Sequence, residues 1–290
     1  MTLEETIAKI KPLDHNAMEI AQKRWDSIAK PLHSLGKLET LLIQIAGITG
    51  NAEVDLSRRG LIAMCADNGV VEEGVTQTGQ EVTAIVAENF LKYDTSVGVM
   101  CKQNHAEIFP VDMGMVTDTK VRTDHKIAYG TQNMAKGPAM TREQAVKGLE
   151  AGIDMVRELN DKGYRILATG EMGIGNTTTS SAVASVLLKQ PVEEMTGRGA
   201  GLTSEGLVRK INAIKKAITL NKPDPEDAID VLAKVGGLDI AGMAGVFLGG
   251  AVYGIPVVMD GFISCVSALI AMRICPAARD YILASHVSKE

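Results

Sequence analysis

The sequence has few of the features that mark several common protein classes. Only four cysteines occur in 290 residues, at positions 65, 101, 265 and 275, and no two of them form a Cys-x-x-Cys pair. This spacing gives neither a disulfide framework nor a zinc motif, so we expect reduced thiols. The N-terminal segment Met-Thr-Leu-Glu-Glu-Thr is acidic and contains no apolar leader. Together these absences predict a cytoplasmic protein.

Positive charge is not in excess either. The chain has 35 acidic and 30 basic residues, which gives a formal net charge of -5. Because a nucleic-acid-binding face needs clustered Lys and Arg, we expect no nucleic-acid partner and favour a small-molecule ligand. Aromatic residues make up only 3%, whereas 29 glycines are spread along the chain. That composition is typical of an α/β protein with many tight turns.

One uncharged run, residues 240–259, has about the length of a membrane-spanning helix. Its five glycines and Pro256 interrupt the run, however, and divide it into a helix ending at Tyr253 and a buried strand, Ile255–Met259. We therefore predict that the protein does not cross a membrane.

Predicted strands and helices alternate along most of the chain. Short apolar runs predict the buried strands 61–66, 108–111, 166–169, 255–259 and 281–284. Apolar residues at helical spacing predict helices within 3–49, with Asp14 as a possible cap, and over 82–90 and 141–159. Thr141 and Gln144 form a capping box for the last of these.

The most informative stretch runs from Arg165 to Leu188. An apolar strand leads into Gly170-Glu-Met-Gly-Ile-Gly and then into a Ser/Thr-rich helix start. The glycines allow a positive φ and close approach of a ligand, and residues 176–179 can cap the helix and offer N–H and hydroxyl groups to an anion. A tight strand-to-helix turn without a ligand is the alternative interpretation.

The presence of Glu171 favours a loop with a function over a turn without a ligand. A carboxylate is unfavourable beside an anion-binding helix start unless it meets a cation or takes part in chemistry. The Gly-x-x-Gly-x-Gly spacing matches neither the dinucleotide fingerprint nor the P-loop, so a nicotinamide-dependent oxidoreductase is a weak hypothesis.

This stretch resembles the signature of the nicotinate-nucleotide:dimethylbenzimidazole phosphoribosyltransferases, which activate the lower ligand of cobamides such as vitamin B12. Further similar stretches follow in family order over nearly the whole chain. They are Lys30-Pro31…Ser34-Leu35-Gly36…Leu38-Glu39, Ala66-Asp67-Asn68-Gly69-Val70…Glu73-Gly74-Val75, Gly197-x-Gly199-x-Gly201 and Val258-Met259-Asp260-Gly261-Phe262-Ile263-Ser264. Leu238-Asp239 departs from the Phe-Glu that is common in the family.

The resemblance implies a doubly wound, mostly parallel Rossmann-like sheet. It also implies a small helical subdomain from residues 1–50 beside an α/β nucleotide-binding domain, 51–290. The expected partners are nicotinate mononucleotide, an aromatic base and a second subunit, in a homodimer or in a heterodimer with a homologue.

The resemblance also assigns site residues. Glu171 becomes a supporting acid/base group, and no metal or other cofactor is expected. The acceptor-base pocket is assigned to Asn68, Thr76 and Met172. The phosphate and ribose are assigned to Gly173, Asn176, Thr177, Thr178, Gly199, Gly201, Lys210, Asp260 and Ser288.

The reaction implied is transfer of the phosphoribosyl group of nicotinate mononucleotide to a base such as 5,6-dimethylbenzimidazole, giving alpha-ribazole phosphate and nicotinate. Family sequences carry the glutamate believed to be the main base in a Leu-Gly-Glu-Gly stretch, which we expect beyond Glu290. The alternative is a nucleotide-binding partner subunit of a heteromeric transferase that works with phenolic or purine acceptors.

Overall fold

A computed structural model describes residues 2–288 and contains one five-stranded, wholly parallel sheet. The strands lie in the order β2-β1-β3-β4-β5. Their bounds are β1 (Arg59–Ala66), β2 (Ala106–Gly114), β3 (Ile166–Met172), β4 (Val257–Met259) and β5 (Ile282–Ala284). The expected doubly wound α/β architecture is thereby confirmed.

The strand order places a topological switch point between β1 and β3. From β1 the chain moves outward to β2 and then returns to build the sheet on the other side. The connections leaving β1 and β3 therefore diverge and open a crevice at the carboxyl ends of these strands, where ligands bind in open α/β sheets.

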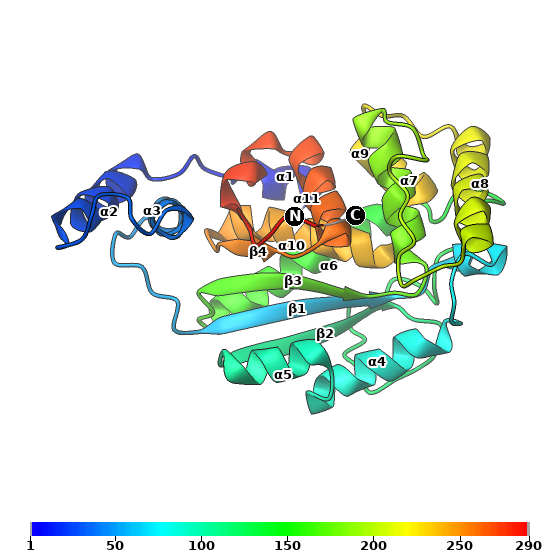
Figure 1. The fold of residues 1–290 in the computed structure, drawn as a ribbon, viewed down its shortest axis with the longest axis horizontal. Helices are drawn as coiled ribbons and strands as arrows, with labels where there is room; N and C mark the ends of the chain where they lie inside the picture. Colours follow the sequence, from blue (N-terminus) through cyan, green and yellow to red (C-terminus); the bar gives the residue numbers. More distant parts are fainter. Residues whose placement is uncertain (1, 289–290) are drawn as a thin grey trace.

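Helices cover both faces of the sheet (Figure 1). In that view α4 and α5 lie below the strands, and α6 and α10 lie above them. The helices are α1 (Leu3–Ile7), α2 (His15–Ser27), α3 (Lys37–Thr49), α4 (Glu81–Lys92), α5 (Ser96–Gln103), α6 (Arg142–Asp161), α7 (Asn176–Leu188), α8 (Ser204–Asn221), α9 (Ala228–Val235), α10 (Leu238–Tyr253) and α11 (Phe262–Ile274). Short 3₁₀ segments, η1 (Gly69–Glu73) and η2 (Pro276–Tyr281), complete the elements.

The N-terminal segment contributes to two parts of the molecule. Helices α2 and α3 pack on each other and form the unit at the left end of Figure 1. Helix α1, in contrast, lies against α6 and α10, and its Leu3 is buried in the main core. The boundary at residue 50 stays a prediction.

Several local expectations are confirmed. Thr141 and Gln144 form the capping box of α6, and Asp14 caps α2. The run 240–259 divides into α10 and β4 as predicted, and no helix in residues 2–288 is long and apolar enough to cross a membrane.

Two expectations about the central stretch are wrong. Residues 170–172 belong to β3 rather than to the loop, because they continue the ladder beside Ala63, Met64 and Cys65 of β1. The N-cap of α7 is Gly175, whose φ of 96° lies in the left-handed region, and no side chain caps this helix. The loop therefore shrinks to residues 173–175.

The packing of α6 on α10 depends on glycine. A Cβ at Gly152 would collide with the backbone oxygen of Gly242, and one at Gly245 would collide with the backbone oxygen of Leu149. Because these obstacles are backbone atoms, neither helix can relieve the collision by a rotamer change. The absence of side chains at this crossing lets α10 lie close to α6.

We therefore predict that Gly152→Ala lowers the free energy of unfolding by about 1–3 kcal/mol, the usual cost of overpacking a core. Urea denaturation measures it. Gly137→Ala is the matched control, because a Cβ there meets no atom within 4 Å. Equal stabilities of the two variants would contradict the close helix crossing.

Candidate active site

Glu171 lies at the carboxyl end of β3, next to the switch point. Its Cα pairs with that of Met64 in β1, and its side chain is only partly buried. Two recesses meet there, and Thr169, Gly170, Glu171 and Asp260 line both of them. A carboxylate that faces two adjoining recesses can act on a pair of substrates.

The α5 recess, as we call the first, has a volume of about 310 Å³. It lies on the face of the sheet that carries α4 and α5, and it is mostly apolar. Its remaining lining residues are Leu61, Ala63, Phe90, Ser96, Val97, Met100, Ala168, Val258 and Ser285. Such a surface suits a flat, uncharged ring.

The second, the α11 recess, is smaller, about 140 Å³, and more polar. The start of α11 forms one wall with Gly261, Phe262, Ile263 and Ser264, and Thr177, Met243 and Ser288 complete the lining. Ser264 also accepts a hydrogen bond, at 3.2 Å, from the backbone N–H of Asp260. This contact fixes the turn after β4 and keeps the exposed Asp260 at the mouth of both recesses.

Glu171 is linked to a fully buried acid, Asp239, through one amide. Asn176 Nδ2 donates to Glu171 Oε2 and, over 3.1 Å, to Oδ2 of Asp239. Burial, the charge of Asp239 and, less strongly, that of Asp260 raise the pKa of Glu171 to about 7, against the lowering effect of Asn176. Burial likewise raises the pKa of Asp239 to about 6. Glu171 can therefore gain or lose a proton near neutral pH.

A glycine-rich loop, residues 197–201, and a buried lysine of α8 lie beside the start of α7. Lys210 in α8 is 1% exposed, and its Nζ donates to Thr177 Oγ1 at 2.9 Å and to the Gly197 carbonyl at 3.1 Å. Gly199 and Gly201 have φ values of 55° and 102°. A Cβ at Gly199 would come within 2.9 Å of Thr177 Oγ1. The glycine loop can therefore lie directly over the helix start and the lysine, which together suit a phosphate.

Other predicted site residues take supporting positions. Gly173 lets the loop pass between the Ala66 carbonyl and Asp239, because a Cβ there would lie 2.5 Å from each. Thr178 is fully buried, so it presents no exposed atom to a ligand. Arg198, between the first two glycines of the loop 197–201, donates to the Leu202 carbonyl and to Ser204 Oγ and so stabilises its own loop.

The predicted acceptor residues lie apart from both recesses. Asn68 is fully buried behind the loop, Thr76 Oγ1 donates to the Thr78 carbonyl, and Met172 packs under α4. None of the three is among the residues that line the recesses in the described part of the chain. Their assignment to the acceptor stays a prediction, while the α5 recess offers the apolar surface.

A cluster of metal-ligand-type side chains occurs among the described residues. Asp124, His125 and Glu158 lie together. Arg122 donates to both carboxylates of this cluster, and these hydrogen bonds, with a smaller contribution from its positive charge, lower their pKa values. The arginine therefore already occupies the place of a cation.

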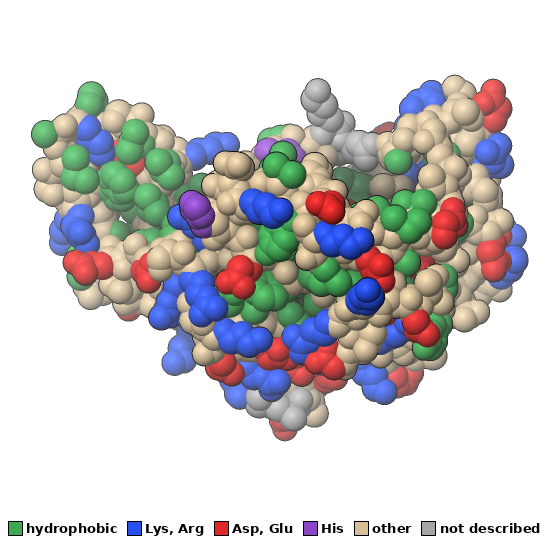
Figure 2. Space-filling view, turned by 90° about the horizontal axis from the view of Figure 1, so that it is seen from below, with side chains coloured by type: hydrophobic (Ala, Val, Ile, Leu, Met, Phe, Trp, Pro, Cys, Tyr) green, Lys and Arg blue, Asp and Glu red, His purple; other side chains and the backbone are tan. Residues whose placement is uncertain are grey.

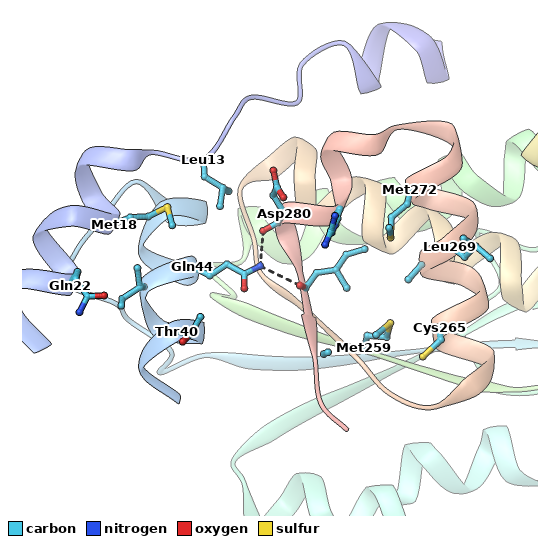
Figure 3. Close-up of a pocket in the computed structure, with 15 residues that line it drawn as sticks. Leu13, Met18, Gln22, Thr40, Gln44, Met259, Cys265, Leu269, Met272 and Asp280 are labelled. Carbon is cyan, nitrogen blue, oxygen red and sulfur yellow. Dashed lines mark hydrogen bonds between the residues drawn. The ribbon is translucent and has the colours of Figure 1, made fainter. Parts of the chain in front are cut away.

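A larger cavity of about 760 Å³ lies between α3, α11 and β5 (Figure 3). Its lining is mostly apolar, with Met18, Met259, Leu269 and Met272 among the residues facing it. Gln44 Nε2 crosses to the carbonyls of Asp280 and Ile282 at 2.8 and 3.3 Å and so joins α3 to the edge of the sheet. Glu171 is not among its lining residues.

Sequence reasoning did not assign Asp239 to the site. Asp239 begins an otherwise uncharged helix and is fully buried. A single acid at the start of an apolar helix is the signal that could have identified it, because a buried carboxylate needs a partner.

Comparison with known proteins gives a consistent result. The family model described as "Phosphoribosyltransferase" matches residues 10–290. Nicotinate-nucleotide–dimethylbenzimidazole phosphoribosyltransferases from Ruminiclostridium cellulolyticum and Clostridium acetobutylicum are 53% and 51% identical, over 100% of this chain and 83% of each relative. The crystal structure of CobT from Thermus thermophilus is 36% identical, with a TM-score of 0.88 over 94% of this chain and 82% of that one.

The relatives match the chain from end to end, and the solved structure has the same fold. The chain therefore belongs to the nicotinate-nucleotide–dimethylbenzimidazole phosphoribosyltransferase family.

Proposed function

We propose that the protein is a pentosyltransferase that moves the phosphoribosyl group of nicotinate mononucleotide to a lower-ligand base such as 5,6-dimethylbenzimidazole. The products are alpha-ribazole phosphate and nicotinate. The observation that carries the proposal is the position of Glu171 and Asp260 between a polar recess and an apolar one, beside a glycine loop with a buried lysine.

The donor fits the polar side. Lys210 and the N–H groups of the loop 197–201 provide the charge and the donors for a phosphate, and Thr177 and Ser288, which line the α11 recess, can add hydroxyl hydrogen bonds. The carboxylate of Asp260 follows a strand end, where it can accept hydrogen bonds from ribose hydroxyls. Fixing phosphate and sugar orients C1 toward the α5 recess.

The acceptor fits the apolar side. Phe90, Val97 and Met100 form a surface for an aromatic ring, and the carboxylate of Glu171 can receive the proton that an azole loses on attack. Such general base catalysis contributes about 10²–10⁴-fold. We propose Glu171 as a supporting base. Glu290 lies outside the described residues, and a main base beyond it stays a prediction.

The heteromeric partner subunit remains a weaker candidate. Relatives that match the whole chain are named as phosphoribosyltransferases, and the Glu171 site is present here.

We propose no metal or cofactor. Among the described residues the four cysteines are free thiols, which supports a reducing compartment, and we propose the cytoplasm.

We also propose a homodimer, formed through the apolar surface of α2, α3 and the loop between them. Figure 2 shows hydrophobic side chains gathered on the lobe at the left. Lys30 Nζ and Glu39 Oε1 form a buried ion pair of 2.8 Å that holds the loop in shape. A preformed apolar patch of this kind favours association. Its exposed members are Ile20, Ile28, Leu32, Leu35 and Leu38.

The deciding experiment for the reaction is chromatography of nicotinate mononucleotide incubated with the protein and 5,6-dimethylbenzimidazole. We expect nicotinate release and a ribazole phosphate only when both substrates are present. Because the α5 recess has a mostly apolar lining, benzimidazole, adenine and phenol should compete with 5,6-dimethylbenzimidazole for it. Strict use of dimethylbenzimidazole would refute the broad pocket, and absence of nicotinate release would refute the function.

The phosphate assignment predicts that Lys210→Ala weakens the binding of nicotinate mononucleotide by about 1.5–3 kcal/mol, the scale of a hydrogen bond to a charged group. Titration calorimetry measures it, and nicotinate riboside, which has no phosphate, should bind equally to both proteins. Lys210→Met keeps the buried volume and guards against misfolding. Lys216→Ala, at an exposed position of the same helix, is the control. Unchanged nucleotide affinity would place the phosphate elsewhere.

The dimer proposal predicts that Leu32→Glu combined with Leu35→Glu yields monomers in sedimentation velocity, because both side chains would bury a charge in the interface. Val208→Glu, at a position 57% exposed on α8, should leave the dimer intact. Dimers of the double variant would place the interface on another surface.

A further inference from the structure

Asp239 has no part in the function proposed above, yet it is the fully buried acid nearest to the site. It lies in the first turn of α10, and its Oδ1 accepts the backbone N–H of Ile240 at 3.0 Å. Its Oδ2 accepts from Asn176, the residue that also donates to Glu171. Three elements, β3, α7 and α10, are thus joined through a chain of acid, amide and acid.

The amide at the centre of this chain has a fixed orientation. An Asn side chain has two donor hydrogens on one nitrogen, and here one is directed to each carboxylate. If the amide were flipped, its oxygen would face two acids, which is unfavourable unless both are protonated. Each acid therefore holds the amide in place for the other.

Asp239 has no room to move away. A Cβ on Gly173 would lie 2.5 Å from its Oδ2, and one on Gly237 would lie 2.5 Å from its Oδ1. The Asn68 side-chain amide lies on its other side, and this contact lowers the pKa of Asp239, although neither Nδ2 nor Oδ1 of Asn68 makes a well-formed hydrogen bond among residues 2–288. The acid is held by backbone on two sides and by an amide on a third.

The charges around Glu171 are of one sign. Asp239 reaches it from α10, Asp260 from the turn after β4, and Cys65 of β1 lies within range of both Glu171 and Asp239. The residues that α4 and α5 contribute to the recess, Phe90, Ser96, Val97 and Met100, carry no charge. Asp239 is accordingly the strongest charge acting on Glu171.

We infer that Asp239 is a positioning residue for the transfer reaction: through Asn176 it holds the carboxylate of Glu171 at the α5 recess, and it places a second acidic group beside that carboxylate. This inference rests on the proposed function. The raised pKa values of the two acids, about 7 and about 6, agree with one proton shared by the pair near neutral pH.

Two variants separate orientation from charge. Asp239→Asn keeps an acceptor oxygen for Asn176 but removes the negative charge, so Glu171 should ionise about one pH unit lower. The ratio of kcat/KM at pH 6 to that at pH 8 should then rise about fivefold, because Glu171 must be ionised to act as a base. Asp239→Ala removes the acceptor as well, and kcat should fall about tenfold with little change in the KM for the nucleotide.

One control variant and one measurement that does not depend on activity complete the test. Asp154→Asn removes a surface acid that pairs with Arg157 on α6, and it should leave the pH profile unchanged. Carbon-13 NMR of glutamate side-chain carboxyls, assigned with Glu171→Gln, reports the pKa of Glu171 directly. A downward shift of that pKa in Asp239→Asn is expected even if the protein proves to transfer a different group.

The results that would overturn the inference are specific. If the pKa of Glu171 is the same in wild type and Asp239→Asn, the two acids are not coupled. If Asp239→Ala keeps full kcat while remaining folded by circular dichroism, the acid does not position Glu171. Lack of transferase activity in the wild type, with the NMR shift present, refutes the proposed function but leaves the coupling in place.

Discussion

The candidate site depends on one amide group that two carboxylic acids share. Asn176 is held between Glu171 and Asp239, and these three residues come from a strand and two helices that are distant in the sequence. Two ionised carboxylates so close together repel, and the amide that donates to both, together with the proton that Glu171 can hold, stabilises the arrangement. The central loop, the start of α10 and the end of β3 are therefore fixed together.

This connection is possible because backbone segments approach each other closely. Gly173 and Gly237 leave room for the carboxylate of Asp239, and Gly152 and Gly245 let α10 lie close to α6. Any side chain at these four positions would push the start of α10 away from the switch point. These glycines lie in different parts of the chain, but together they determine the position of Asp239 relative to β3.

Much of the fold could be predicted from the sequence. The strand runs, the capping box at Thr141 and the division of residues 240–259 all follow local patterns that the structure confirms. The end of β3 could not be predicted, because Gly170 and Glu171 are poor strand formers that pairing with β1 holds in the ladder. The role of Asp239 could not be predicted for a similar reason: Asn176, which links it to Glu171, lies 63 residues away along the chain.

The two recesses share the strip formed by Thr169, Gly170, Glu171 and Asp260, and their helical walls come from different helices. Helices α4 and α5 contribute to one, while α7, α10 and α11 contribute to the other. Substitutions in α5 can thus remodel one wall and leave the glycine loop, Lys210 and Asp260 untouched. In such a fold, substitutions in a single helix can change which acceptor is bound during evolution, while the residues that bind the donor stay under unchanged selection.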